Sequence, residues 1–236
     1  MTTEVLPLTL DDDPARARQG TIGYRVFDAI RQAIVQLQLR PGNLLSEADV
    51  ARQLGVSRQP VREAFIKLAD VGLVEVRPQR GTFVKLISIR EVQNARFVRE
   101  AIEIAIVRKA ALEASRGKIA ELDRILAEQR EASERGDHVA FLRLDEAFHQ
   151  AVAHSADCDH AWRVLEGLKA QMDRVRYLSM PNATPIDTLI GQHAAIVDAL
   201  GRHAPDDAEA AMRLHLSEIL TSLPRLAQAH RELFTD

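Results

Sequence analysis

The alternation of apolar and polar residues predicts three helices in the first third of the chain. Apolar positions recur at helical spacing from Thr21 until the Arg-Pro-Gly sequence at 40–42, which ends the first helix. Ser46 and Ser57 are suited to cap two shorter helices, and Gly55 ends the first of these. Two short helices joined by a tight glycine turn are typical of a helix-turn-helix.

The hydrophobic period changes after Gly72, where two short segments have the pattern of strands. Residues 73–76 (LVEV) and 82–86 (TFVKL) flank the sequence RPQRG, which is suited to the tip of a hairpin. A hairpin that directly follows a helix-turn-helix forms a wing. The pattern therefore predicts a winged helix-turn-helix made of three helices plus a β-hairpin.

From Ser88 onward the chain follows a helical pattern throughout. Ser88 and Glu91 have the spacing of a capping box, and glycine and proline separate the successive apolar stripes. The predicted helices cover about 88–115, 117–135, 138–155, 159–179, 185–201 and 205–223, and Pro224 kinks or ends the last. This part is expected to be an all-α helical bundle, so the fold class of the chain is mainly α.

Length and composition agree with two small domains. The chain has 236 residues, of which 46% are hydrophobic and 28% charged, as in ordinary globular proteins with a packed core. Because the pattern changes near residue 86, we expect a winged helix at 21–86 and a helical domain at 87–236. The polar residues 1–20 are expected to be a flexible N-terminal extension.

The sequence favours a cytoplasmic protein with no membrane partner. No apolar run approaches the roughly 20 residues that a membrane helix needs. The acidic N-terminus lacks the basic region of a signal peptide. The single cysteine, Cys158, excludes an internal disulfide and suits a reducing compartment.

Charge is distributed unevenly along the chain. Residues 21–86 contain ten Lys or Arg and six acidic residues, a net charge of +4, whereas the whole chain has a net charge of −3. A basic small domain joined to an acidic larger one indicates that a polyanion contacts one end only.

The second helix of a helix-turn-helix lies in the DNA major groove, with its first turn facing bases and phosphates. That turn holds Ser57, Arg58, Gln59 and Arg62 here. Arg58 and Arg62 are four residues apart and share a helix face, so one can contact a guanine while the other neutralises a phosphate. Any one of these arginines alone could equally belong to a solvated face, but the turn, the hairpin and the local charge together favour DNA binding.

The segment LSEADVARQLGVSRQPVREAFIKLADVGLVEVRPQRGTFV resembles the winged helix of the GntR family of bacterial transcription regulators. The resemblance covers residues 21–86. It implies that Arg58, Gln59 and Arg62 contact bases or phosphates, that Arg52 contacts a phosphate, and that Arg80 and Gly81 form the wing tip. Ala48 stands where some relatives have an arginine that touches DNA.

Asp145 and His149 are four residues apart, so both side chains can reach one point beside a single helix. His193 and His215 also lie in apolar helical surroundings. An exposed salt bridge within the first pair would contribute only a few tenths of a kcal/mol, and a lone histidine of this kind is usually a satisfied core residue. Three histidines on different helices, with a carboxylate beside one of them, favour a divalent metal site with Zn²⁺, Ni²⁺ or Mn²⁺.

Residues 88–230 resemble the all-helical FCD effector domain of the FadR branch of the same family. Its metal-binding members have an Asp-x-x-x-His pair and two further histidines, which match Asp145, His149, His193 and His215. The resemblance also places the family's arginine at Arg99, in the sequence VREAIE, where it would pair with an effector carboxylate. Two departures are Gln192, which replaces an acid, and Cys158, which replaces a frequent asparagine.

Three functions are compatible with this combination. The first is a transcription regulator, expected to be a repressor, that binds palindromic operator DNA as a homodimer. It would respond to a small carboxylate or sugar acid bound at the metal, which is expected to be Zn²⁺. The second is a regulator whose metal is purely structural. The third is a metalloenzyme, which we reject because Glu146 points to another side of the helix than Asp145 and no HExxH sequence is present.

Overall fold

The computed structural model describes residues 8–10, 21–180 and 185–236, and these divide into two compact units. One unit, here called the winged-helix unit, comprises the described part of Met1–Glu91 together with Ala170–Tyr177 and His230–Asp236. The other, here called the helical unit, comprises Val92–Lys169 and the described part of Leu178–Ala229.

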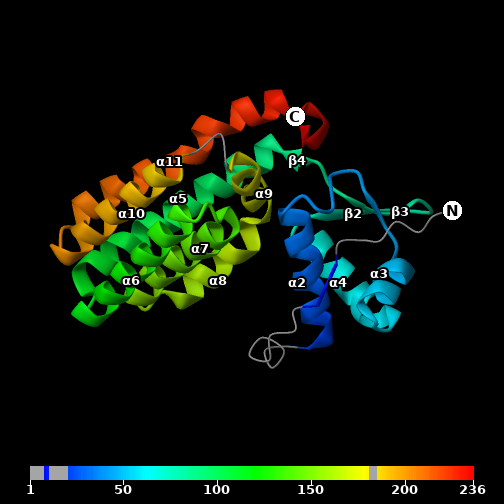
Figure 1. The fold of residues 1–236 in the computed structure, drawn as a ribbon, viewed down its shortest axis with the longest axis horizontal. Helices are drawn as coiled ribbons and strands as arrows, with labels where there is room; N and C mark the ends of the chain where they lie inside the picture. Colours follow the sequence, from blue (N-terminus) through cyan, green and yellow to red (C-terminus); the bar gives the residue numbers. More distant parts are fainter. Residues whose placement is uncertain (1–7, 11–20, 181–184) are drawn as a thin grey trace. The chain divides into compact units, whose positions relative to one another are not determined.

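Three helices build most of the winged-helix unit: α2 (Ile22–Val35), α3 (Glu47–Leu54) and α4 (Arg58–Asp70), with α2 packed against α4 (Figure 1). The Ser46 side chain caps α3 as predicted, because its Oγ accepts the Asp49 N–H at 3.4 Å. Gly55 ends α3 with a positive φ of 64°, which a residue without a Cβ adopts freely. Ser57 occupies the N-cap position of α4 as predicted, but its exposed side chain accepts no capping hydrogen bond among the described residues.

The wing is a three-stranded antiparallel sheet in the order β1-β3-β2. Its hairpin joins β2 (Val74–Arg77) to β3 (Gly81–Val84), close to the predicted strands. The third strand, β1 (Leu44–Leu45), was not predicted. Gly81 has a φ of +108°, and a Cβ there would lie 2.7 Å from Leu44 Cδ1, so this sheet requires glycine at the wing.

A second, parallel pair of strands joins distant parts of the chain within the winged-helix unit. β4 (Ile87–Ser88) pairs with β5 (Phe234–Thr235), which follows the short 3₁₀ helix η1 (Arg231–Leu233). No strand was predicted after the wing, and this prediction was wrong for β4 and β5. A strand of two residues is too short to have a recognisable period.

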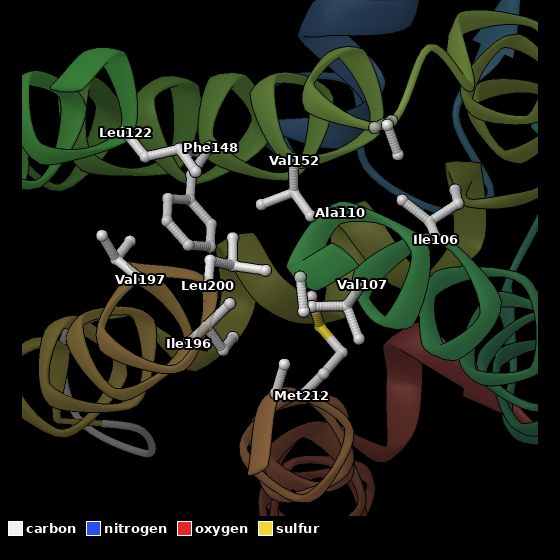
Figure 2. Packing of buried hydrophobic residues seen from close by; sticks show 14 of the residues in the cluster. Ile106, Val107, Ala110, Leu122, Phe148, Val152, Ile196, Val197, Leu200 and Met212 are labelled. Carbon is white, nitrogen blue, oxygen red and sulfur yellow. The ribbon is translucent and has the colours of Figure 1, made fainter. Parts of the chain in front are cut away.

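The remaining helices are α5 (Ile89–Glu113), α6 (Arg116–Glu134), α7 (His138–Ser155), α8 (Asp159–Leu168), α9 (Ala170–Ser179), α10 (Ile186–Gly201) and α11 (Pro205–Ala229). The core of the helical unit is apolar and draws on α5, α6, α7, α8, α10 and α11 (Figure 2). Within it, Val107, Phe148 and Ile196 are fully buried. The predicted all-α bundle is confirmed.

Two helix boundaries differ from the prediction. The single helix expected at 159–179 is broken at Lys169, which separates α8 from α9. The last helix does not end near Pro224 but continues to Ala229. The Pro224 ring is exposed, while the buried Leu223 and Leu226 anchor the helix on either side of it, so packing compensates for the one backbone hydrogen bond that proline removes.

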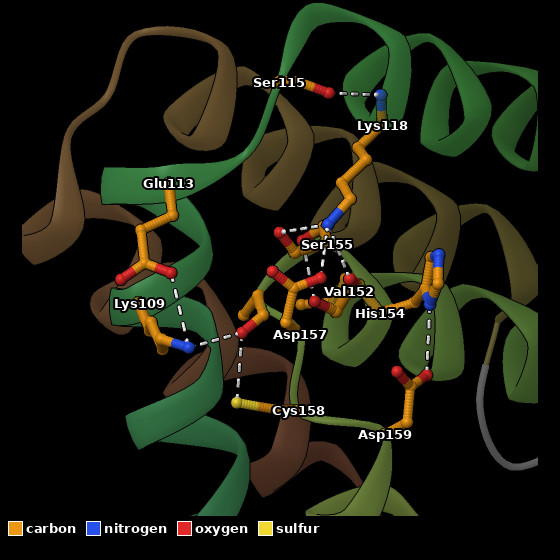
Figure 3. Close-up of polar contacts among 11 residues, drawn as sticks. Lys109, Glu113, Ser115, Lys118, Val152, His154, Ser155, Asp157, Cys158 and Asp159 are labelled. Atoms are coloured by element: carbon orange, nitrogen blue, oxygen red, sulfur yellow. Dashed lines mark hydrogen bonds and ion pairs between the residues drawn. The ribbon is translucent and has the colours of Figure 1, made fainter.

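The C-terminal end of α7 is held by lysines (Figure 3). Lys109 Nζ donates to the Ala156 carbonyl at 2.7 Å, and Lys118 Nζ reaches the His154 carbonyl at 3.0 Å and Asp157 Oδ1 at 2.8 Å. Cations at the carbonyl end of a helix stabilise its exposed carbonyl groups and its dipole. Cys158 packs beside them, its Sγ 3.4 Å from the same Ala156 carbonyl.

Within the described residues, no helix is long and apolar enough to cross a membrane.

Candidate functional site

Four side chains from three helices converge in the interior of the helical unit. Asp145 and His149 come from α7, His193 from α10 and His215 from α11, and one ligand atom from each lies within 4.8 Å of the others. The imidazole Nε2 atoms of His149 and His215 are 3.0 Å apart, and those of His193 and His215 are 3.3 Å apart. All four residues are at most 6% exposed. The structure therefore brings together the four ligands that were predicted for the metal.

The outward-facing nitrogen of His193 meets an acceptor. Its Nδ1 lies 2.9 Å from Gln129 Oε1 on α6, and the Gln129 amide nitrogen donates to the Leu144 carbonyl at 3.2 Å. Because that carbonyl can only accept, it fixes the amide with its oxygen toward the imidazole. Nδ1 of His193 consequently carries the proton.

His215 has the same arrangement, and Gln192 supplies it. His215 Nδ1 lies 3.1 Å from Gln192 Oε1, while the amide nitrogen of Gln192 lies 3.3 Å from Glu218 Oε2. The Glu218 carboxylate accepts from the amide, so the amide oxygen faces the ring. Gln192, the glutamine that departs from the resembled family's acid, is therefore suited to hold the His215 tautomer.

The third imidazole faces a buried carboxylate that the sequence analysis gave no role. Glu103 on α5 is 3% exposed, and its Oε2 is 2.5 Å from His149 Nδ1. Its other oxygen accepts from Arg99 Nε. Burial opposes ionisation of Glu103, but the charge of Arg99 and the contacts with His149 outweigh it and lower the pKa of Glu103 to about 2. Glu103 is thus an anion beside His149.

Burial lowers the pKa of His149, with Arg99 acting in the same direction, while Glu103 opposes the shift. The imidazole is therefore neutral near pH 7, and its one proton belongs on Nδ1 beside the carboxylate. All three histidines direct Nδ1 toward an oxygen acceptor and Nε2 toward the centre of the cluster. Three inward-facing imidazole nitrogens beside one carboxylate form a set of donors that could hold a divalent cation.

The donor set fits such a cation. Three neutral imidazoles and one carboxylate suit Zn²⁺, Ni²⁺ or Mn²⁺, and outer acceptors that fix the ligand tautomers are the usual surroundings of metal-bound histidine. When bound, the metal would supply a positive charge able to hold an anionic oxygen.

The first prediction concerns Glu103. Glu103→Gln removes the charge that orients His149 and holds Arg99, and it is expected to weaken Zn²⁺ binding about tenfold or more. Competition with a chromophoric chelator measures this affinity. Glu113→Gln is the matched control, because Glu113 lies on the same helix and pairs with Lys109 at the surface. Equal Zn²⁺ affinity for both variants would remove Glu103 from the site.

The predicted effector contact Arg99 lies beside this cluster. It is 6% exposed and forms a buried ion pair with Glu103 one turn further along α5. In this arrangement Arg99 Nε donates to the Glu103 carboxylate and not to an effector. Glu103 is the residue that sequence reasoning missed here, although it lies four residues after Arg99 in the same VREAIE sequence.

The predicted DNA-contacting side chains lie on the surface of the winged-helix unit. The exposed residues are Arg52, Ser57, Arg58, Gln59, Arg62, Arg80 and Gly81. Two of the arginines are paired with carboxylates of α3: Arg62 reaches Glu47 with Nε and Nη2, each at 3.2 Å, and Arg52 lies 2.9 Å from Asp49. Gln59 donates to Glu63 at 3.0 Å. The exposed end of α4 is therefore polar and already ordered by α3.

Comparisons with known proteins agree with both units. Residues 23–84 match the model of the family described as "Bacterial regulatory proteins, gntR family", and residues 95–218 match the FCD domain. The chain is 42% identical over 215 residues to the HTH-type transcriptional repressor RspR of Escherichia coli (strain K12), which covers 91% of this chain and 94% of the relative. A probable D-xylose utilization operon transcriptional repressor of Paenarthrobacter nicotinovorans is 30% identical, with 89% and 92% covered.

Among solved structures, E. coli McbR/YncC has the same fold, with a TM-score of 0.76 and 21% identity over 90% of this chain and all of that one. A putative GntR transcriptional regulator from Rhodococcus sp. RHA1 has a TM-score of 0.70 and 25% identity, with 84% and 96% covered. The metalloenzyme alternative has no counterpart among these regulators. The chain belongs to the GntR family of bacterial regulatory proteins, in which its winged helix is followed by an FCD domain.

Proposed function

We propose that the protein is a transcriptional repressor of the FadR branch, and that a small carboxylate or sugar acid bound at a divalent metal changes its affinity for operator DNA. One observation carries this proposal. The same chain joins an exposed, arginine-bearing helix-turn-helix to a buried Asp/His₃ cluster in which the Nε2 atoms of the three histidines converge.

On the DNA side, the first turn of α4 would enter the major groove. Arg58, Gln59 and Arg62 would contact bases or phosphates, Arg52 a phosphate, and Arg80 and Gly81 the backbone or minor groove. Operators read by helix-turn-helix modules are usually palindromic, so the acting species would be a homodimer. The repressor role is supported by the names of the two relatives with known or probable repressor function.

On the effector side, a bound divalent metal would change the charge of the site. Asp145 and Glu103 contribute two negative charges and Arg99 one positive charge, so a divalent ion leaves the cluster with a net charge of about +1. A monoanionic carboxylate would neutralise it. This arithmetic favours a carboxylate or sugar acid over a cationic or uncharged ligand.

A second function remains for the same cluster, because closed Asp/His₃ sites in helical bundles also serve structure alone. In that case the metal would stabilise the helical unit, and no small molecule would alter DNA binding. The buried position of all four ligands is what favours this alternative.

One titration distinguishes these functions. Operator DNA selected from a random pool would be bound to the Zn²⁺-loaded and metal-free protein, and fluorescence anisotropy would report affinity as small carboxylates and sugar acids are added. We expect at least one acid to change the dissociation constant fivefold or more with metal and not without it. A panel that leaves DNA affinity unchanged supports the structural metal and contradicts the effector role.

A further inference from the structure

Lys169 and Ala170 are neighbours in sequence but are buried in different units. Lys169 is 5% exposed in the helical unit, where it forms an ion pair with Glu146 of α7 and lies with Nζ 5.5 Å from the Trp162 ring centroid. Ala170 is 2% exposed and belongs to the apolar cluster that forms the core of the winged helix. A single peptide bond therefore connects a residue buried in the helical unit to a residue buried in the winged-helix unit.

The helix that begins at Ala170 is tied to the winged helix by polar contacts. Gln171 Nε2 donates to the Gly72 carbonyl at 2.7 Å, in the turn between α4 and β2. Asp173 lies 3.0 Å from Arg31 of α2, and both side chains are largely buried. These contacts fix the first two turns of α9 within the winged-helix unit, which also contains α4.

Arg174 is the most demanding of these contacts. Its side chain is fully buried, and it donates to the Lys85 carbonyl at 2.8 Å and to Gln171 Oε1 at 3.2 Å. Among the described residues its Nε has no acceptor. Burial lowers the pKa of Arg174 to about 10, so it stays charged near pH 7. Burying a cation costs free energy when its partners are neutral acceptors, as they are for Arg174. The packed position of α9 is therefore only moderately stable, and a small change in free energy could shift it.

Lys169 is linked through Glu146 to the helix that carries two residues of the Asp/His₃ cluster. Glu146, the partner of Lys169, directly follows Asp145 on α7, and His149 lies one turn further on. Trp162 lies close to both His149 and Lys169. Its ring is nearly parallel to that of His149, with the ring centroids 6.4 Å apart, and Lys169 Nζ lies 5.5 Å from the Trp162 ring centroid. A change in α7 that accompanies metal binding would therefore act on Glu146 and through it on Lys169.

We propose that α9 transmits occupancy of the metal centre to the winged-helix unit, with the Lys169–Glu146 ion pair as its connection to the metal-binding helix. This inference rests on the proposed function in taking the Asp/His₃ cluster to bind a divalent ion. Coupling between two sites requires an element whose conformation is influenced by both of them. Helix α9 meets this requirement, because hydrogen bonds and an ion pair hold it in the winged-helix unit and its first residue follows Lys169, which is buried in the helical unit. Helix α5 also runs from one unit into the other, so the test must separate the two.

Hydrogen exchange of the full chain, with Zn²⁺ and after chelation, tests the role of α9. In the wild type, Zn²⁺ is expected to slow amide exchange in peptides covering α9 at least threefold. Glu146→Gln and Lys169→Met should reduce that effect below 1.5-fold while still binding one Zn²⁺ per chain. Both changes keep the shape of the side chain, and thermal unfolding checks the fold. Asp157→Asn is the matched control, because it breaks a Lys–carboxylate pair at the other end of α7.

The outcomes separate the two proposals. If wild-type protein binds Zn²⁺ and exchange in α9 does not change, α9 does not transmit occupancy of the site. If Glu146→Gln and Lys169→Met respond as the wild type does, the Lys169–Glu146 ion pair is not the connection and the proposal fails. If α9 responds in the wild type but operator affinity does not, the transmission stands and the proposed regulation by the metal centre fails. A chain that binds no Zn²⁺ overturns both.

Discussion

Arg62→Ala is expected to weaken operator binding at least ~30-fold. One arginine contact to a base or phosphate contributes about 1–3 kcal/mol. The proposed homodimer would lose this contact twice, so the loss would be about 2–6 kcal/mol, at roughly 1.4 kcal/mol per factor of ten. The fold should be unchanged, because the Arg62 side chain is 62% exposed and an ion pair in contact with solvent, such as the one with Glu47, adds little to stability. Fluorescence anisotropy with labelled operator measures the change.

Lys67→Ala is the matched control for this experiment. Lys67 is also an exposed cation on α4, but it lies in the last turn of the helix, away from the end proposed to face DNA. We expect less than a threefold loss, most of it from long-range charge. Equal losses for the two variants would mean that α4 attracts DNA only through net charge and does not read it through its first turn.

The contact between Arg62 of α4 and Glu47 of α3 bears on the proposed role of Arg62 in DNA binding. Glu47 accepts from Nε and Nη2 of Arg62, which are two of the donors of its planar fork. The side chain is thereby held in one orientation before DNA arrives, so less conformational freedom is lost on binding.

The parts of the fold that were predictable are those with a local cause. The cap at Ser46 and the glycine after α3 determine where the helix-turn-helix begins and turns, and both are visible in a few consecutive residues. The convergence of the Asp/His₃ cluster was predictable for a related reason, since Asp145 and His149 are one turn apart and the other two histidines lie in apolar stripes.

The parts that could not be predicted depend on contacts between distant residues. Glu103 is 46 positions from His149, and Gln129 is 64 from His193, so their roles exist only once the helices have packed. The break at Lys169 has the same origin. The apolar pattern of 159–179 is continuous, but Lys169 is drawn toward Glu146 while Ala170 is buried in the other unit.

Removal of the metal is expected to have the largest effect on stability. A ligand present at about 1,000 times its dissociation constant stabilises the state that binds it by ~4 kcal/mol. For a chain of this length each kcal/mol moves the melting temperature by about 2–4 °C. EDTA should therefore lower the melting temperature of the Zn²⁺-loaded protein by about 10 °C, and added Zn²⁺ should restore it. Circular dichroism at 222 nm follows the transition because the chain is mainly helical.

His193→Ala tests whether the cluster causes this shift. The variant should melt at the same temperature with and without EDTA, because it lacks a ligand that is fully buried beside His215 and Asp145. His154→Ala is the control: it removes an imidazole from the same helix as His149, but one that is exposed and paired with Asp159. That variant should keep one Zn²⁺ per chain and the full EDTA shift. A His193→Ala protein that retained stoichiometric Zn²⁺ after dialysis would exclude His193 as a ligand.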